Sequence, residues 1–323
     1  MALHFTSLNS GSNGNCYYIG NDSEAILVDA GLSCRETEKR MRRLGLSMER
    51  VRAIFVSHEH TDHIKGIPVI ATKHRLPVYI TSGTLQNWGF ALEQQLVVSF
   101  RAYEPVRIGA LHITAFPKFH DAADPHSFTI FSEGLTIGVF TDIGVTCEHL
   151  VHHFQHCHAA FLESNYDEEM LDKGSYPIYL KNRIRGGVGH LSNRQALELF
   201  RTHRPASLSH LFLSHLSQNN NDPDLALNLF QAHAGQTKVI VASRHEETAI
   251  YSLQGLPAGT YSMQPVYMAP PPARPLTPPV APVLPAPAHR PALTPQPALT
   301  QKPARKTQPA KQVPPVSTQY TLF

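Results

Sequence analysis

The sequence predicts an α/β protein followed by a proline-rich tail. Short apolar runs typical of buried strands alternate with helical segments as far as about residue 253. Several of these runs end in a histidine or an aspartate, which indicates that the chemistry lies at strand ends. The rest of the chain is rich in proline and has no acidic residue. With 323 residues, 42% of them hydrophobic, the chain can bury a sizeable core.

The apolar runs are interpreted as strands because each is short and bounded by polar or turn-forming residues. They are Leu3–Leu8, Tyr17–Ile19, Ala25–Val28, Val51–Val56, Val78–Thr81, Leu111–Phe116, Ser127–Phe131, Leu135–Phe140, Ala159–Leu162, Leu211–Ser214 and Lys238–Val241. Between the first two, Asn13-Gly14 predicts a β-hairpin with a type I′ turn, in which both central residues need a positive φ. The alternative role of this glycine-rich loop is to present backbone N–H groups to a phosphate.

Three helices are predicted from their capping residues. Their starts are Ser33 with Glu36, Ser192 with Gln195, and Asp222 followed by Pro223. The first helix runs to about Arg43, where Gly45 stops it, and the second extends from about Asn193 to His203.

The segment Ser57–His63 reads SHEHTDH and follows one of the predicted strands. Alternate side chains of an extended segment share a face, so His58 and His60 can converge on one point while Asp62 and His63 turn to a second. Imidazoles and a carboxylate suit borderline divalent cations such as zinc. The spacing therefore predicts a two-metal site. The alternative is a histidine-rich surface loop, which a protein with 20 histidines could contain by chance.

Further polar residues follow other predicted strands. His120 and Asp142 lie at or just beyond strand ends, and His215 follows the strand that ends at Ser214, so a rigid sheet could hold each as a ligand. Asp29 ends the run ILVD, and we expect it to orient the metal ligands rather than bind metal itself. Cys157, in the run HHFQHCHAA, could join a metal site, although a helix end leading into a strand is the simpler interpretation.

The cysteines and the apolar runs indicate in which cellular compartment the protein is expected to reside. Cys16, Cys34, Cys147 and Cys157 show neither a CxxC spacing nor a small secreted framework, which predicts reduced thiols in a cytoplasmic protein. The sequence shows no targeting pattern and no apolar run long enough to cross a membrane, so we expect no membrane association.

The tail accounts for the basic character of the chain. It carries 17 of the 26 prolines between Pro265 and Pro315, and from Gln264 onward six basic residues and no acid. Such a segment cannot bury enough apolar surface to offset its ordering entropy, so it should be disordered with a polyproline II bias. Removing its six charges from the net +3 leaves the predicted folded part at about −3. The charge therefore does not predict a nucleic-acid-binding surface on that part.

Taken together, these motifs resemble a known family. The residues His58, His60, Asp62, His63, His120, Asp142 and His215 occur in the order of the ligand motifs of the metallo-β-lactamase fold. The runs LVDAG, HEHTDH, FHDAADP, TDIG, ESNYDEEML, GHLSN and HLSQNN resemble the YycJ/WalJ subfamily of bacterial metallohydrolases, regarded as DNA exonucleases. The resemblance covers roughly residues 1–253. It implies a four-layer αβ/βα sandwich with the metals in a cleft at one edge of the two sheets.

The resemblance also implies a role for each site residue. One divalent ion, Zn²⁺ or Mn²⁺, would take His58, His60 and His120, and a second would take Asp62, His63 and His215, with Asp142 bridging. His190 is similar to the histidine that lies near the leaving group in ribonuclease Z, and Glu163 to the carboxylate that orients it. The alternative for His190 is a helix-entry residue that only bonds backbone. Asp62, Glu163 and His190 are the expected catalytic residues.

The chain also departs from related patterns. Tyr166 stands where the subfamily often has histidine, so we assign it no chemistry. Only 47 residues lie between Asp142 and His190, too few for the clamping insertion of the β-CASP nucleases. How the folded part binds nucleic acid is therefore left open. The triple Asn219-Asn220-Asn221 could contact phosphates, but a capped turn is the simpler interpretation.

The tail ends in QYTLF, which is similar to the Gln-x-x-Leu-Phe peptide that binds bacterial sliding clamps. In that peptide the glutamine anchors the motif while leucine and phenylalanine fill an apolar pocket, roles that would fall to Gln319, Leu322 and Phe323. We therefore expect a catalytic domain over residues 1–258, a disordered linker over 259–318 and a clamp-binding peptide over 319–323.

Three classes of function remain. The first is a metal-dependent DNA exonuclease acting on ends or single strands in repair or replication and tethered to the clamp. The second is a hydrolase of a small thioester, lactone or phosphodiester, since the same ligands serve all of these reactions. The third is a non-catalytic module whose tail is the functional part. A complete ligand set argues against the third, because burying so many titratable groups without metal is costly.

Overall fold

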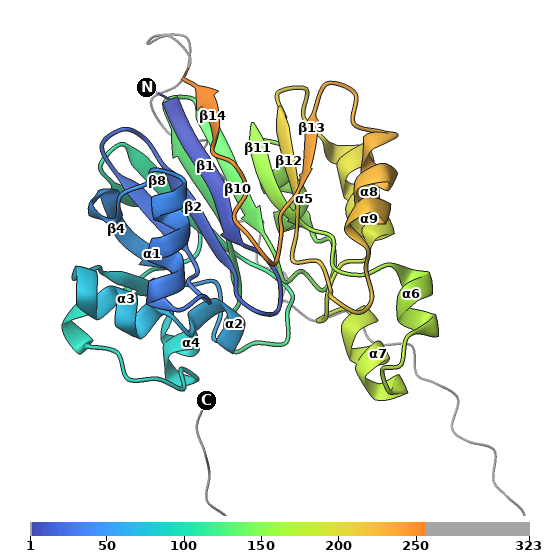
Figure 1. Ribbon diagram of the computed structural model, residues 1–323, viewed down its shortest axis with the longest axis horizontal. Helices are drawn as coiled ribbons and strands as arrows, with labels where there is room; N and C mark the ends of the chain where they lie inside the picture. The colour runs from blue at the N-terminus through green and yellow to red at the C-terminus, as the bar shows by residue number, and fades with distance from the viewer. Residues whose placement is uncertain (1, 256–323) are drawn as a thin grey trace, which may run out of the picture. The chain divides into compact units, whose positions relative to one another are not determined.

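The computed structural model describes residues 2–255 of the chain (Figure 1). Its strands are β1 Ala2–Asn9, β2 Cys16–Gly20, β3 Ala25–Val28, β4 Val51–Phe55, β5 Val78–Ile80, β6 Val97–Ser99, β7 Val106–Ile108, β8 Leu111–Pro117, β9 His126–Ser132, β10 Leu135–Phe140, β11 Ala159–Glu163, β12 His210–Ser214, β13 Lys238–Val241 and β14 Tyr251–Gln254. Its α-helices are α1 Cys34–Arg43, α2 Thr61–Ile64, α3 Ile67–His74, α4 Ser82–Gln86, α5 Glu148–Phe154, α6 Glu168–Lys173, α7 Ile178–Arg185, α8 Asn193–His203 and α9 Pro223–Gln231.

The strands form two mixed sheets of seven strands each. The first sheet has the order β14-β1-β2-β3-β4-β5-β6, and the second has the order β13-β12-β11-β10-β9-β8-β7. In the first sheet, β3 to β6 run parallel and the pairs among β14, β1, β2 and β3 are antiparallel. In the second, β10 to β13 run parallel and the pairs among β7 to β10 are antiparallel.

The alternation of side chains along each strand creates separate apolar layers. On β2, Tyr17 and Ile19 point into a core shared by the two sheets, whereas Cys16 and Tyr18 pack in the core beneath α1 and α3. A third core lies between the second sheet and the helices α5, α8 and α9. Helices thus cover both outer faces of the paired sheets (Figure 1). This is the four-layer αβ/βα sandwich expected from the sequence.

Every strand predicted from an apolar run is present, with ends shifted by at most two residues. The hairpin between β1 and β2 is also confirmed, but the predicted type I′ turn is wrong. Gly14 has a φ of 150°, outside the range that such a turn requires, and Asn13 is not among the residues with positive φ. The loop is six residues long and closes instead through a bond from the Gly14 N–H to the Gly11 carbonyl (2.9 Å).

The predicted helix starts are confirmed. Ser192 and Gln195 form a reciprocal capping box, and Asp222 accepts bonds from two backbone N–H groups at the start of α9. Ser33 caps α1 by accepting from the Glu36 N–H, whereas the Glu36 carboxylate pairs with Arg40 one turn further on (2.9 Å).

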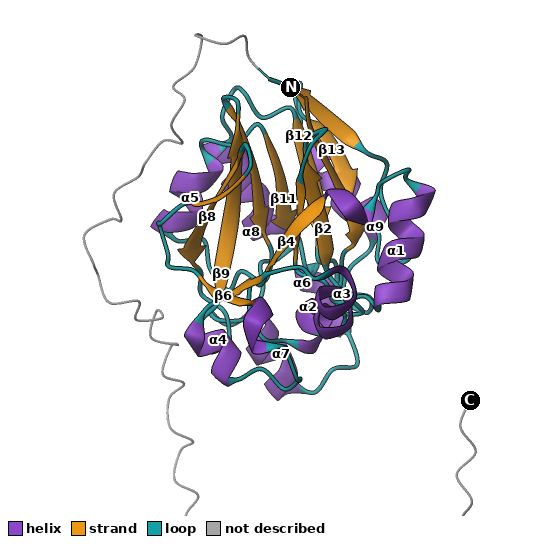
Figure 2. Cartoon of the chain, turned by 90° about the vertical axis from the view of Figure 1, so that its left-hand side faces the viewer, coloured by secondary structure: helices purple, strands orange, loops and turns teal. Residues whose placement is uncertain are grey.

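The parallel strands bring the predicted ligands to one edge of the two sheets. β8 and β10 are both antiparallel to β9, so β8 runs in the same direction as β10, β11 and β12. The loops that follow these strands therefore emerge at the same edge. Helices α2, α4, α6 and α7 gather at this end of the strands (Figure 2).

Two expectations fall wholly or partly outside the described residues. The linker over 259–318 and the peptide over 319–323, with the domain boundary at residue 258, lie beyond residue 255. Within residues 2–255, none of the helices is both long and apolar enough to span a bilayer.

Candidate metal centre

Three of the polar residues at the sheet edge have an uncommon backbone conformation. Asp29, Asp142 and His215 follow β3, β10 and β12 closely and have φ angles of 59°, 57° and 58°. This left-handed region is uncommon for residues other than glycine and costs on the order of 1 kcal/mol. The chain turns sharply at all three positions, and each side chain lies within the same polar cluster. Strain that is concentrated in this way is typical of functional sites.

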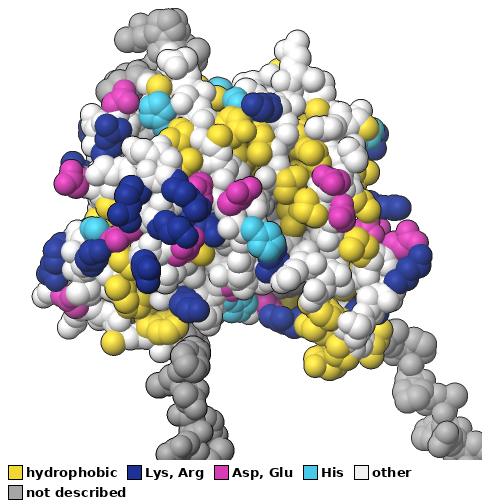
Figure 3. Space-filling view, in the orientation of Figure 1, with side chains coloured by type: hydrophobic (Ala, Val, Ile, Leu, Met, Phe, Trp, Pro, Cys, Tyr) yellow, Lys and Arg dark blue, Asp and Glu magenta, His cyan; other side chains and the backbone are white. Residues whose placement is uncertain are grey.

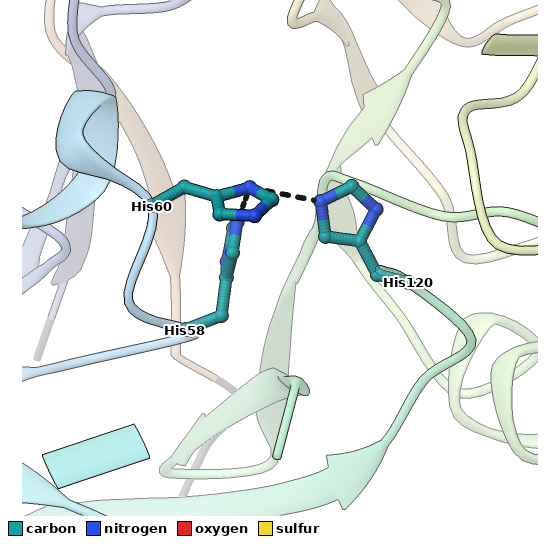
Figure 4. Close-up of side chains that lie close together, drawn as sticks. All are labelled: His58, His60 and His120. Atoms are coloured by element: carbon teal, nitrogen blue, oxygen red, sulfur yellow. Dashed lines mark hydrogen bonds between the residues drawn. The ribbon is translucent and has the colours of Figure 1, made fainter. Parts of the chain in front are cut away.

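The first group of candidate ligands is a triplet of histidines (Figure 4). His60 Nδ1 lies 3.1 Å from His58 Nε2 and 3.3 Å from His120 Nε2. His58 and His60 come from the loop between β4 and α2, and His120 follows β8. The three nitrogens lie within 4.8 Å of one another, close enough to bind a single cation.

The second group consists of Asp62, His63 and His215. Asp62 Oδ2 lies 3.6 Å from both His63 Nε2 and His215 Nε2. Asp62 and His63 belong to α2, in the first sheet's half of the molecule, whereas His215 follows β12 of the second sheet. The group therefore exists only because the two sheets face each other.

Asp142 lies between the two groups. Its Oδ2 is 3.2 Å from His63 Nε2, and its Oδ1 is 3.7 Å from His120 Nε2. One carboxylate thus contacts a member of each group, as a bridging ligand would. All seven residues for which the sequence predicted a metal-binding role are brought together here.

The buried polar atoms of the site fit a divalent cation. Asp142 Oδ2 and His215 Nε2 are both buried and, although His63 and Asp62 lie close to them, neither makes a hydrogen bond of acceptable geometry among the described residues. An unpaired polar atom in the interior costs free energy, which a cation bound between these atoms would offset. The donors are imidazole nitrogens and carboxylate oxygens, the set that zinc and manganese accept.

The electrostatics of the site show how strongly it attracts positive charge. Burial by itself would lower the pKa of His63, but the carboxylates of Asp142, Asp62 and Asp29 outweigh it and raise this pKa to about 10. Burial lowers the pKa of His120 to about 3, so this imidazole is neutral and able to ligate at physiological pH.

Asp29 contacts His63 directly and His58 through Ser57. Its Oδ2 lies 2.7 Å from His63 Nδ1, and Ser57 donates to Asp29 through both its backbone N–H and its hydroxyl (2.8 Å each). The Ser57 hydroxyl is also 2.9 Å from His58 Nδ1. Asp29 therefore contacts His63 Nδ1 and leaves Nε2 free for a metal, the arrangement that the predicted orienting role requires.

Asp29→Asn is expected to lower metal affinity about 10- to 100-fold, the usual effect of losing a carboxylate that orients a ligating histidine. Asparagine tolerates the left-handed backbone at this position, so the fold should persist. Metal content after dialysis against graded chelator concentrations measures the effect, with Asp22→Asn in the β2–β3 turn as the control. Unchanged metal retention by Asp29→Asn would contradict the orienting role.

Glu163 has a wider role than the sequence indicated. This fully buried carboxylate lies at the end of β11, and its Oε1 is 2.9 Å from Nδ1 of both His190 and His215. Its Oε2 accepts the backbone N–H groups of Ile143 (2.7 Å) and Leu191 (3.1 Å). Burial raises the pKa of Glu163, but His190 and the hydrogen bonds lower it to about 2, so the group stays ionised.

Some residues that support the site were not predicted. Asn15 donates to Asp62 Oδ2 (3.1 Å), and Ser10 Oγ accepts the backbone N–H of His215 (2.7 Å). The glycine-rich loop thus holds ligands of the second group in place. Lys118 is buried and donates to the carbonyl of Thr141, next to Asp142 (2.6 Å). Its place two residues before His120, at the end of a strand, was the signal that could have identified it.

Close backbone packing explains the glycine in LVDAG. A Cβ atom on Gly31 would lie only 1.7 Å from the carbonyl oxygen of Asp62. Gly31 therefore allows the loop after β3 to pass directly beneath α2.

Cys157 takes no part in the cluster. It is buried between α5 and β11, and its thiol donates to the carbonyl of His153 (3.3 Å). The interpretation of this run as a helix end leading into a strand is confirmed.

Two facing mixed sheets with a histidine and aspartate cluster at one edge define a metal-dependent hydrolase of the metallo-β-lactamase fold. The chain belongs to the β-lactamase superfamily, since the family model described as "Beta-lactamase superfamily domain" matches residues 24–215.

Two curated relatives cover most of the described chain. The Exodeoxyribonuclease YycJ of Bacillus anthracis is 36% identical over 231 residues, which are 70% of this chain and 87% of the relative. The Exodeoxyribonuclease WalJ of Streptococcus pneumoniae is 30% identical over 235 residues, 70% of this chain and 86% of the relative.

Solved structures support the fold. The metallo-β-lactamase fold protein YhfI from Bacillus subtilis superimposes with a TM-score of 0.62 at 15% identity, covering 78% of this chain and 100% of its own. Zn²⁺-bound PqqB from Methylobacterium extorquens gives 0.61 at 14% identity, covering 78% of this chain and 99% of its own.

Proposed function

We propose that the protein is a DNA exonuclease that uses two divalent ions, Zn²⁺ or Mn²⁺. The observation that carries the proposal is the pair of ligand groups joined by Asp142 beside the Glu163–His190 pair. It occurs in a chain that aligns over 70% of its length with relatives named exodeoxyribonucleases. The proposed ligands are His58, His60 and His120 for one ion, and Asp62, His63 and His215 for the other, with Asp142 shared.

When bound, the ions supply Lewis-acid activation of the phosphodiester and of a water. The carboxylate oxygens of Asp62 and Asp142 both lie near His63 Nε2 (3.6 Å and 3.2 Å), and the attacking water would be held beside them. His190 lies at the edge of the cluster, with its ring centroid 5.2 Å from those of His120 and His215. Glu163 holds His190 Nδ1, so Nε2 is the nitrogen that can donate a proton to the departing oxygen.

The proposal is tested by incubating the purified full chain with end-labelled single- and double-stranded DNA, and with RNA, in the presence of Zn²⁺ or Mn²⁺. We expect mononucleotides to be released from DNA ends. The His60→Ala variant should be inactive, because it lacks the ring nitrogen that lies close to both His58 and His120 in the first group. Intact polynucleotides after incubation of the metal-loaded wild type would refute the proposal. Hydrolysis of a thioester or lactone under the same conditions would then identify the protein as a small-molecule hydrolase.

The sequence of the tail extends the proposal. Gln319, Leu322 and Phe323 match the Gln-x-x-Leu-Phe pattern, and the preceding proline-rich segment, if extended at about 3.1 Å per residue, could span on the order of 150 Å. We propose that this peptide tethers the enzyme to the sliding clamp and so raises its effective concentration at DNA. This would support a role in repair or replication.

Deleting residues 319–323 is expected to abolish binding of the purified clamp, measured by surface plasmon resonance. Tyr320→Ala serves as the control, because the pattern leaves that position free. Clamp binding that survives the deletion would rule out the tether.

A further inference from the structure

Outside the metal centre, a further group of metal-binding side chains comes together on the helices that cover the first sheet. Cys34 and Glu38 belong to α1 and are four residues apart, so they share one face of that helix. His74 is the last residue of α3, and its imidazole reaches the same point. The thiol sulfur, a carboxylate oxygen and a ring nitrogen all lie within 4.8 Å of one another. These are the three types of donor atom that zinc accepts in proteins.

The separations between these atoms fit a single tetrahedral ion. The Cys34 thiol donates to Glu38 Oε1 across 3.4 Å. Around a tetrahedral zinc, a sulfur at about 2.3 Å and an oxygen at about 2.0 Å lie roughly 3.5 Å apart, nearly the observed separation. His74 Nε2 lies 2.7 Å from the same oxygen, as in a direct hydrogen bond. Because nitrogen and oxygen ligands of zinc lie about 3.3 Å apart, an ion would separate these two atoms by only roughly 0.6 Å more.

The group is closed on the side of the protein and open to solvent on the other. Cys34 is 7% exposed and packs in the apolar core beneath α1 and α3. The side chains of Glu38 and His74 are 21% and 23% exposed. Three protein ligands with one open side allow a water molecule to be the fourth ligand.

Lys73 competes with an ion for Glu38. Its Nζ lies 2.6 Å from Glu38 Oε1, but the lysine side chain is 55% exposed. Ion pairs of this kind contribute about 1 kcal/mol or less, so the ammonium can turn into solvent at little cost. The contacts of Glu38 with Cys34, Lys73 and His74 all fall on Oε1, and the second oxygen of the carboxylate takes part in none of them. An ion and Lys73 can therefore share the carboxylate.

The charge of the surroundings selects the kind of ion. Helix α1 carries five basic residues against two acidic ones. Figure 3 shows lysine and arginine side chains gathered on the face of the molecule where α1 and α3 lie. Such a surface does not attract cations by its charge, and Mg²⁺ or Ca²⁺ would need more oxygen ligands than one glutamate supplies. A thiolate and an imidazole instead favour Zn²⁺, which is held by coordination.

We propose that Cys34, Glu38 and His74 form a separate metal site that binds one zinc ion, with a water as the fourth ligand. Binding replaces the thiol proton, which passes to solvent, and His74 binds through Nε2 with its proton on Nδ1. This inference does not depend on the reaction that the metal centre catalyses.

An ion at this site would tie α1 to α3. Helix α1 follows the loop that carries Asp29, and α3 follows α2, which carries Asp62 and His63. The ion would therefore stabilise the two segments that supply and orient part of the metal centre, without being part of that centre.

Cobalt substitution tests the site, because a thiolate bound to Co²⁺ gives a charge-transfer absorption band in the near ultraviolet. The proposed ligands of the metal centre are nitrogens and oxygens only, so they cannot give this band. The full chain is stripped of metal, loaded with Co²⁺ and desalted before its spectrum and metal content are measured. We expect the wild type to show the band, and Cys34→Ser to lose it and to retain one ion fewer per chain. Cys147→Ser is the matched control and should keep both the band and the ion.

A second variant and a stability measurement separate loss of the site from loss of the fold. His74→Ala removes a partly exposed ligand, and it should lose the band as Cys34→Ser does. Zn²⁺ should raise the thermal unfolding midpoint of the wild type more than that of either variant, relative to the midpoints in excess chelator. A wild type without the band after desalting would overturn the proposal. A band that persists in Cys34→Ser, or equal stabilisation of all three proteins by Zn²⁺, would overturn it as well.

Discussion

Replacing Asp142 by asparagine is expected to lower DNA hydrolysis about 1,000-fold without unfolding the protein. Asp142 is the carboxylate that contacts both ligand groups, and an amide nitrogen in place of Oδ2 would face His63 Nε2 across 3.2 Å. Metal-ion catalysis contributes several kcal/mol, and each 1.4 kcal/mol corresponds to about tenfold in rate. Asparagine accepts the left-handed backbone at this position more readily than most residues, so local strain should not confuse the result.

The experiment combines three measurements on the purified variant: the rate on end-labelled DNA, the metal content by mass spectrometry and the thermal unfolding midpoint. Asp22→Asn is the matched control, because its carboxylate is largely exposed and lies in the turn between β2 and β3. An Asp142→Asn protein with an unchanged rate and a full complement of metal would exclude a bridging role.

Replacing His190 by alanine is expected to lower DNA hydrolysis about 100-fold or more, the usual contribution of a general acid. The loss should depend on the leaving group. A deoxynucleoside oxygen must be protonated as it departs, whereas 4-nitrophenolate is stable as an anion. His190→Ala should therefore hydrolyse bis(4-nitrophenyl) phosphate nearly as fast as the wild type does.

The Glu163→Gln variant distinguishes the two histidines that this carboxylate contacts. Because Glu163 Oε1 lies 2.9 Å from both His190 and His215, its loss should slow the hydrolysis of both DNA and bis(4-nitrophenyl) phosphate and should reduce metal retention. Equal losses on the two substrates for His190→Ala would show that His190 supports the metal centre and does not protonate the leaving group.

The positions of the proposed ligands could be predicted from the sequence because the segments that carry them follow apolar runs whose strand character is unambiguous. His58 and His60 follow β4, and His215 follows β12, so the edge of a sheet determines where they lie. The second contact of Glu163 could not be predicted. It depends on the parallel pairing of β11 with β12, which no local pattern specifies.

The elements that the sequence did not indicate are short or weakly patterned. Strand β14 has only Leu253 buried, and α7 begins after Pro177 without a side-chain cap. The left-handed backbone conformations of Asp29 and Asp142 could not be predicted from the sequence either, because they arise from the contacts of the assembled site. Local composition cannot reveal a conformation that tertiary structure imposes.

The pairing of β14 with β1 has a consequence for how the protein is made. Ala2 pairs with Gln254, so β1 gains this neighbour only after about 245 further residues have been synthesised. At 5–20 residues per second, this takes roughly 12–50 s. Until then one edge of β1 stays unpaired, and such an edge can join another chain. A nascent chain that stalls before Tyr251 would therefore depend on chaperones to avoid aggregation.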